Sequence, residues 1–332
     1  MSGFLGKLMR LLGCTPTHKY VSDLTLIKDM EYMLKTNKTS VLMYPEAGYS
    51  FDGRTTTLPR KLGILMKKLG VPVVTVITQG AFHRDPLYNM LQIRDVKVSA
   101  HVKCLATAEE LKELSVAELD ARLDEAFSFD NFAWQRDNRI SIDVPFRADG
   151  LHRILYKCPH CGAENRMEGK GIHLTCHACG RQWEMDEFGQ LHALEGETEY
   201  PHIPDWYAWE RECVRKELEE GTYLLDTDVQ IGIQVNLDGI CMIGTGHLTH
   251  SLNGFHLTGA DGQLDYTQSP VAAHTLYADY YWYEIGDVIG IGNNEFSYFC
   301  FPGADVSVTK ARLATEELYK LQKAARRRKR TE

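Results

Sequence analysis

The chain has 332 residues, of which 44% are hydrophobic and 25% are charged, a composition typical of a globular protein with two or three domains. The formal net charge of -8 at pH 7 disfavours binding of nucleic acid over the whole surface. No apolar run reaches the length that a membrane-spanning helix needs. We therefore expect a soluble protein whose partners do not include nucleic acid.

Helix and strand signals alternate over residues 1–140. Apolar residues at helical spacing predict helices, and short continuous apolar runs predict buried strands. Strand–helix–strand order with nearly continuous apolar strands predicts an α/β domain with a mostly parallel sheet. In chain order, the predicted elements are helices at 4–13 and 23–35, a strand at 40–44, a helix at 60–70, strands at 71–78 and 95–105, and two helices opened by capping boxes at 107–110 and 115–118.

Two C-x-x-C-G motifs follow a linker at residues 141–150. Cys158 and Cys161 form the first pair, and Cys176 and Cys179 form the second, with fourteen residues between the pairs. Each pair brings two thiolates to one metal, and the glycine after it permits a left-handed turn that aims backbone amides at sulfur. The spacing predicts a zinc ribbon whose single zinc ion is structural, because four thiolates leave no open coordination position.

Two other interpretations of these four cysteines stay open, namely a redox-active dithiol and a set of unrelated thiols. Three nearby histidines, His160, His173 and His177, are expected to be bystanders because four sulfur atoms already complete a zinc coordination shell. The remaining five cysteines are scattered singly along the chain. That distribution indicates a reducing compartment, and hence a cytoplasmic protein, because it is not the pattern of a disulfide framework.

Short strands with Gly, Asn and Asp turns are predicted from residue 222 to about residue 302, after a helix at 203–221. A final helix at 305–330 becomes increasingly basic, and its end could grip an anionic membrane surface. The order of hairpins followed by a helix is similar to the pleckstrin-homology or GRAM superfold, a likeness of fold alone. We expect domains at 1–140, 150–198 and 200–332.

Three blocks of the first domain occur in an order that resembles a known family. They read FLGKLMRLLGCTPTHK, YPEAGYSFDG and LGVPVVTV. Together they resemble the second, third and fourth blocks of the glycerolipid (PlsC-type) acyltransferases, over most of residues 1–127. The resemblance implies a mostly parallel α/β domain that transfers an acyl group from a thioester donor, acyl-CoA or acyl carrier protein, to a glycerol phosphate.

The resemblance also implies which residues bind the acceptor. Lys19 stands at the family's usual arginine position in the second block, and Glu46, Ser50 and Gly53 match the third block. Tyr49, however, replaces the arginine that binds phosphate in the family, and a tyrosine cannot make a bidentate, charge-assisted contact. An ordinary glycerol phosphate is therefore not the expected acceptor, unless Arg54 or Arg60 supplies the guanidinium.

The family's first block carries a His-x4-Asp dyad, in which the aspartate orients the imidazole that takes the acceptor's proton. One such motif, His18 to Asp23, occurs at the position where the family has its phosphate-binding strand. Its other interpretation is a solvated turn in which Asp23 caps the following helix. We expect the true dyad to be missing from this chain, either with an absent upstream segment or through a real loss.

The sequence thus predicts an acyltransferase-like protein, peripheral to the membrane, which moves an acyl group to a lipid-like hydroxyl. The chain as given is expected to be inactive or nearly so for want of the dyad. The alternative is a non-catalytic zinc-ribbon scaffold that binds lipid or protein.

Overall fold

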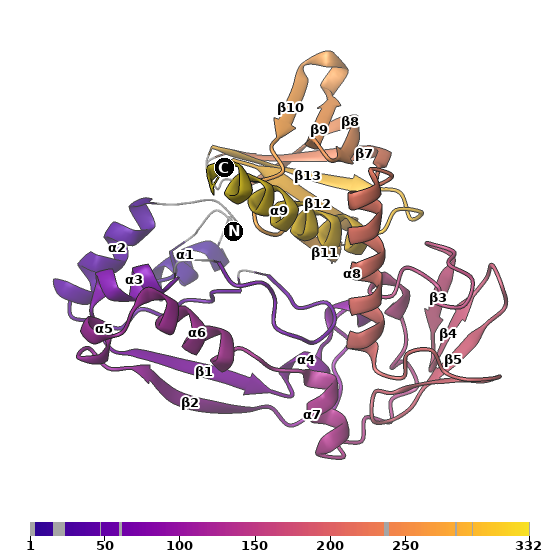
Figure 1. Cartoon of the computed structure of the whole chain (residues 1–332), viewed down its shortest axis with the longest axis horizontal. Helices are drawn as coiled ribbons and strands as arrows, with labels where there is room; N and C mark the ends of the chain where they lie inside the picture. The colour runs from indigo at the N-terminus through magenta and orange to yellow at the C-terminus, as the bar shows by residue number, and fades with distance from the viewer. Residues whose placement is uncertain are drawn as a thin grey trace. The chain divides into compact units, whose positions relative to one another are not determined.

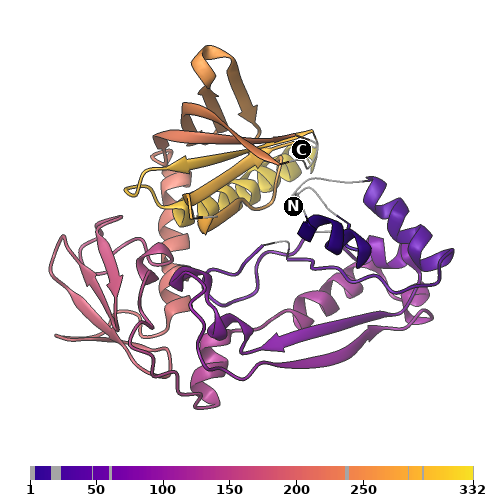
Figure 2. The ribbon, with the colours of Figure 1, turned by 180° about the vertical axis from the view of Figure 1, so that it is seen from behind.

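The computed structural model describes residues 4–15, 24–46, 48–59, 62–235, 239–282, 284–293 and 295–331. The chain divides into two compact units. We call Leu24–Ala208 the ribbon-bearing unit, and Met1–Asp23 together with Trp209–Glu332 the sheet unit. Figures 1 and 2 show the backbone of the whole chain from opposite sides. Within the described residues, no helix combines the length and apolarity needed to cross a membrane.

The ribbon-bearing unit contains helices and short strands around two antiparallel sheets. Its elements are α2 (Leu24–Lys35), α3 (Leu62–Leu69), β1 (Val73–Gln79), α4 (Ala81–Arg84), η1 (Leu87–Asn89), β2 (Ser99–Ala106), α5 (Glu110–Glu113), α6 (Val116–Ala126), α7 (Asn131–Asp137), η2 (Leu151–Arg153), β3 (Met167–Lys170), β4 (His173–Cys176), β5 (Gln182–Met185), β6 (Leu191–Ala193) and the start of α8 (Ile203–Glu220). Both capping boxes are confirmed, since Ser115 and Glu118, and likewise Thr107 and Glu110, exchange side-chain and backbone hydrogen bonds.

The core of the first part of this unit lies between α3, α6 and β2. Leu105, Leu119 and Leu123 are among its buried members. Gly63 of α3 approaches α6 closely, because a Cβ there would lie 2.7 Å from the Val116 carbonyl oxygen. Its amide donates to Asp120 Oδ1 at 2.7 Å, so α6 caps the first turn of α3.

The expected parallel sheet is absent from the described residues. Every strand pair that they form is antiparallel, and β1 pairs with β2 alone. Residues 40–44, predicted as a buried strand, form no strand, and the side chains of Leu42 and Tyr44 are 73% and 79% exposed. The apolar run indicates a preference for burial, but a strand also needs a hydrogen-bonded neighbour, and no described strand pairs with these residues. The coarser α/β assignment holds.

The sheet unit contains one seven-stranded antiparallel sheet and a long C-terminal helix, as expected for the end of the chain (Figure 1). The spatial order of the strands is β10-β9-β8-β7-β13-β12-β11. Two meanders therefore meet where β13 returns beside β7. The elements are α1 (Phe4–Leu11), the rest of α8, β7 (Leu225–Val235), β8 (Ile240–Ser251), β9 (Gly254–Gly259), η3 (Ala260–Gly262), β10 (Leu264–Gln268), β11 (Tyr277–Trp282), β12 (Gly286–Gly292), β13 (Phe296–Pro302) and α9 (Val308–Thr331).

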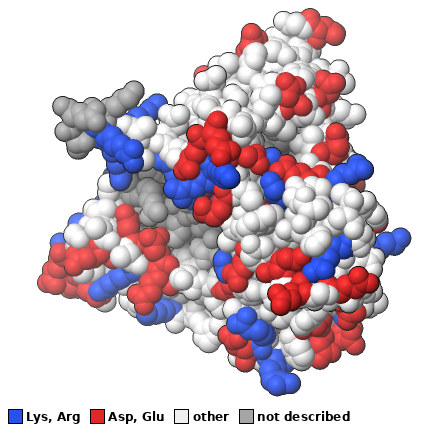
Figure 3. Space-filling model, turned by 45° about the vertical axis from the view of Figure 1, so that its right-hand side comes forward, with Lys and Arg blue, Asp and Glu red and all other residues white. Residues whose placement is uncertain are grey.

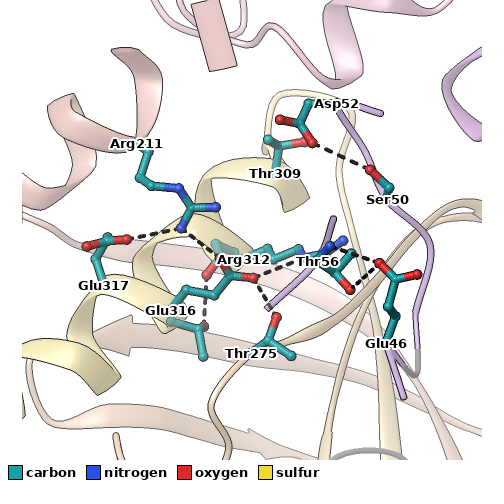
Figure 4. A network of polar contacts seen from close by, with 12 residues as sticks. Glu46, Ser50, Asp52, Thr56, Arg211, Thr275, Thr309, Arg312, Glu316 and Glu317 are labelled. Atoms are coloured by element: carbon teal, nitrogen blue, oxygen red, sulfur yellow. Dashed lines mark hydrogen bonds and ion pairs between the residues drawn. The ribbon is translucent and has the colours of Figure 1, made fainter. Parts of the chain in front are cut away.

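A buried charge network fixes α9 within the sheet unit (Figure 4). Glu316 is 2% exposed, and its carboxylate lies 2.7 Å from Arg211 Nη1 and accepts from the Thr275 hydroxyl at 2.6 Å. Burial alone would raise the pKa of Glu316, but Arg211 and Arg312 outweigh it and hold that pKa below its ordinary value. The paired charges join α9 to α8 and to the segment before β11, and an unpaired buried carboxylate would be costly.

His250 is a second buried ionisable group of the sheet unit, 1% exposed. Its ring stacks on Phe255 with centroids 3.8 Å apart, and its Nδ1 lies 3.0 Å from the Tyr223 hydroxyl. Burial lowers the pKa of His250 to about 3, so the folded chain keeps the ring neutral. His250 is therefore a core histidine with a hydrogen-bonding partner.

We predict that His250 makes the stability of the protein fall in acid. The unfolded state takes up a proton near pH 6.5, whereas the folded state does so only near pH 3, so the contribution is complete above pH 6.5 and is lost as the pH falls toward 3. Urea unfolding between pH 7 and pH 4 measures this. The variant His250→Gln should show a flatter dependence than the wild type, and an equal dependence in both chains would contradict the assignment.

Candidate metal centre and candidate acceptor loop

Two knuckles of matching geometry carry the four cysteines. In the first, the Gly162 amide donates to the Cys158 carbonyl at 2.9 Å, and in the second the Gly180 amide donates to the Cys176 carbonyl at 2.8 Å. Gly162 and Gly180 have φ of 75° and 77°, and a Cβ on either would meet nothing within 4 Å. Glycine is required there for its left-handed backbone and not for space.

The four sulfur atoms form a compact cluster. All lie within 4.8 Å of one another, with Cys158 Sγ 3.9 Å from Cys179 Sγ and Cys161 Sγ 3.8 Å from Cys176 Sγ. A regular tetrahedron with zinc–sulfur bonds of about 2.3 Å has edges of about 3.8 Å. Cys158 and Cys176 are buried whereas Cys161 and Cys179 are exposed. The four cysteines could thus hold a metal ion and are compatible with zinc.

The three histidines near the knuckles are engaged elsewhere. His177 Nε2 lies 3.0 Å from Glu168, and His160 and His173 lie 3.4 Å and 3.6 Å from Glu199 and Glu184. Because each of these histidines lies beside a carboxylate, the four sulfur atoms are the candidate ligands of the metal ion.

The ribbon that carries the knuckles is a four-stranded antiparallel sheet in the order β3-β4-β5-β6. The strand β4 ends on Cys176, and β5 carries Trp183, which is fully buried and donates from Nε1 to Glu199 Oε2 at 3.0 Å. The Trp183 ring packs edge-on against the buried ring of Trp206, with centroids 5.0 Å apart. The ribbon therefore provides a seat for the first turn of α8.

Residues 45–59, which we call the candidate acceptor loop, are closed by their own side chains. Glu46 Oε1 accepts from the backbone amide of Thr56 at 3.0 Å and from its hydroxyl at 3.2 Å (Figure 4). The Ser50 hydroxyl donates to the Arg54 carbonyl at 2.5 Å. Gly53 has φ of 78°, and a Cβ there would lie 3.0 Å from the Phe82 ring, so both backbone and space require glycine.

Arg54 joins this loop to two distant segments of the same unit. Its Nε lies 3.0 Å from Asp130, its Nη2 lies 2.7 Å from Asp205, and its Nη1 donates to the Pro204 carbonyl at 3.3 Å. Asp130 also lies 2.9 Å from His202 Nε2. Burial alone would raise the pKa of Asp130, but bonds from His202, the Ala133 amide and Arg54 lower it to about 2. The Arg54 guanidinium is thus engaged in structural contacts.

The structure brings Glu46, Ser50 and Gly53 together in one loop, and the four cysteines together in one cluster. His18, Lys19, Asp23 and Arg60 lie outside the described residues. The His-x4-Asp spacing also occurs at His256 and Asp261 and at His274 and Asp279. His256 Nε2 lies 2.9 Å from Asp265, and Asp279 Oδ1 accepts from the Tyr280 amide at 2.9 Å.

Sequence reasoning missed the partners of Arg54. Asp130, His202 and Asp205 lie 76 to 151 positions along the chain from it, and no local pattern marks them. Only the helix-capping signal of Asp130, whose Oδ1 accepts from the Ala133 amide at 2.8 Å, was open to detection.

Comparisons with models of protein families, with curated proteins and with solved structures found no match to this chain.

We predict that the purified protein carries about one zinc ion per chain, as a closed four-thiolate site requires. Cys158→Ser should lose the ion because one of its four ligands is removed, and metal analysis of the purified chains measures this. The control is Cys104→Ser, at an exposed cysteine outside the cluster. Full zinc retention by Cys158→Ser would refute the ligand assignment.

Proposed function

We propose that the protein is an acyltransferase-like protein with a structural zinc ribbon, which moves an acyl group from acyl-CoA or acyl carrier protein to a lipid-like hydroxyl. The observation that carries the proposal is the candidate acceptor loop. There Glu46 and Ser50 are held in a glycine-dependent loop, in the block order of the glycerolipid acyltransferases. A loop closed by its own side chains presents a fixed surface to a substrate.

The expected charge of the acceptor depends on whether the candidate acceptor loop offers an arginine to a phosphate. Tyr49 stands at the phosphate-binding position of the third block, and Arg54 is committed to Asp130 and Asp205. A phosphate would therefore find no uncommitted guanidinium on residues 48–59 of this loop. We propose that the acceptor is a lipid hydroxyl with less negative charge than glycerol phosphate, in a pocket that Glu46, Ser50, Gly53 and Lys19 would shape.

A structural role for zinc rests on the closed ligand set. Four thiolates fill a tetrahedral shell, and when bound the ion supplies folding free energy and leaves no position for a substrate. Zinc therefore organises the ribbon, and acyl transfer would depend on other residues.

Attachment to an anionic membrane surface fits the sheet unit. Two meanders in the order β10-β9-β8-β7-β13-β12-β11, followed by α9, support the likeness to pleckstrin-homology or GRAM domains. The exposed basic residues Arg326 to Arg328 lie near the end of α9. In α1, Leu8 is 37% exposed and Leu11 is 83% exposed, so that helix offers apolar side chains to a bilayer.

A second candidate function is a zinc-ribbon scaffold that binds lipid or protein without catalysis. The exposed apolar side chains of residues 41–44, beside the candidate acceptor loop, favour it, because such patches mark binding surfaces. A nucleic-acid-binding ribbon has less support. Residues 151–200 contain five Lys and Arg against eight Asp and Glu, and charges of both signs are interspersed on the face shown in Figure 3.

Acyl transfer from labelled palmitoyl-CoA to a panel of lipid hydroxyls tests the proposal. The panel contains monoacylglycerol and 1-acylglycerol phosphate. We expect little or no turnover by the 332-residue chain, and turnover by the product of any longer in-frame reading that supplies a His-x4-Asp dyad. Glu46→Ala should then lower that turnover about 100-fold.

The control for Glu46→Ala is Glu113→Ala, at an exposed carboxylate of α5. If neither the 332-residue chain nor the longer product transfers an acyl group, and neither binds palmitoyl-CoA in calorimetry, the acyltransferase proposal is rejected and the scaffold function remains.

A further inference from the structure

We infer that the metal centre positions the candidate acceptor loop, through an unbroken series of contacts that runs from the knuckles to the start of α8 and from there to Arg54. The inference rests on the metal-binding part of the proposed function and not on acyl transfer. It makes Arg54 a positioning residue, which acts on the loop by holding it against the segment that the ribbon supports.

The first step joins the knuckles to Trp206. Lys157 immediately precedes Cys158, and its carbonyl accepts from Trp206 Nε1 at 3.0 Å. Trp183, four residues after Cys179, packs edge-on against the Trp206 ring, and both tryptophan rings are fully buried. The seat of Trp206 is thus built from one segment of each knuckle. A metal bound by all four sulfur atoms cross-links these two segments at their cysteines.

The second step joins Trp206 to Arg54. The residues just before Trp206, Pro204 and Asp205, supply a carbonyl and a carboxylate to the guanidinium. His202 adds a third link, because it lies 2.9 Å from the same Asp130 oxygen that Arg54 approaches. Each of the three guanidinium nitrogens of Arg54 therefore has its own acceptor. A lysine could not reproduce this arrangement, because its single ammonium nitrogen lacks the planar, forked set of donors.

The third step joins Arg54 to the rest of the loop. The Arg54 carbonyl accepts from the Ser50 hydroxyl, and its amide donates to Asp52 Oδ1 at 3.3 Å. The Gly53 carbonyl accepts from both the backbone and the side-chain amide of Asn131, at 3.0 Å and 2.7 Å. Since the Asn131 contacts do not involve the ribbon, loss of the ribbon's support would loosen residues 48–56 without releasing them.

Individually, these ion pairs are partly exposed, and such pairs contribute little to stability. Arg54 is 37% exposed and Asp130 is 22% exposed at the side chain. Their effect is expected in local opening of the loop and not in global unfolding, because partly exposed ion pairs contribute little to the global free energy of unfolding. The readout must therefore resolve single segments.

Hydrogen exchange followed by mass spectrometry tests the inference, on the full chain loaded with zinc and on the same chain stripped by a chelator. Stripping should raise exchange about tenfold in residues 48–56, as well as in the knuckles and in residues 202–208. The strand β1, which in the described part of the chain pairs with β2 and with no other strand, should keep its protection and is the internal reference.

Arg54→Ala separates the loop from the ribbon while the metal stays bound. It should raise exchange in residues 48–56 and leave the knuckles and the zinc content unchanged. The matched control is Arg122→Ala, because Arg122 is also 37% exposed and ion-paired, with Glu110. Trp206→Phe removes the bond to the Lys157 carbonyl but keeps an aromatic ring, and should loosen residues 48–56 with zinc bound.

Unchanged exchange of residues 48–56 in Arg54→Ala, or in a stripped chain whose knuckles have opened, would overturn the inference while leaving the zinc site intact. If stripping unfolds β1 as well, the zinc-loaded variants Arg54→Ala and Trp206→Phe decide. A chain that binds no zinc would overturn both the metal site and this inference. None of these results bears on acyl transfer, which the turnover assay decides separately.

Discussion

Four sulfur atoms within 4.8 Å of one another impose the main constraint on residues 150–208. Four neutral thiols this close together stabilise one another little. Burial also raises the pKa of the Cys158 thiol, so that this thiol does not ionise readily without a metal. A divalent metal reverses that situation by replacing the protons and drawing the sulfur atoms into a tetrahedron. We propose that holding the two knuckles together in this way fixes the ribbon, the seat of Trp206 and the start of α8.

The position of Arg54 links this constraint to the proposed chemistry. In the glycerolipid acyltransferases that the third block resembles, an arginine of this block binds phosphate, whereas here the position holds Tyr49 and the nearby Arg54 faces Asp130 and Asp205. The loop would thus gain rigidity and lose a phosphate ligand. A rigid loop without a phosphate ligand suits an acceptor that has a lipid hydroxyl and little charge. It also suits a scaffold that no longer binds substrate.

Local patterns in the sequence predicted local structure well. The two C-x-x-C-G motifs, the capping boxes at Thr107 and Ser115, and the C-terminal helix each depend on residues a few positions apart, where spacing fixes geometry. The strand direction and the lack of a strand at residues 40–44 depend instead on which segments meet, and periodicity does not carry that information. The same limit hid Asp130 and His202, whose role exists only because Arg54 reaches them from far along the chain. The site residues His18, Lys19 and Asp23 remain predictions.

We propose that a closed four-sulfur metal site organises residues 150–208. X-ray absorption at the zinc edge of the purified protein measures the coordination shell directly. We predict four sulfur scatterers at about 2.3 Å from the zinc ion and no nitrogen or oxygen scatterer among its direct ligands. A shell with histidine nitrogen or water oxygen would contradict it, because such a site would be open and would not cross-link both knuckles.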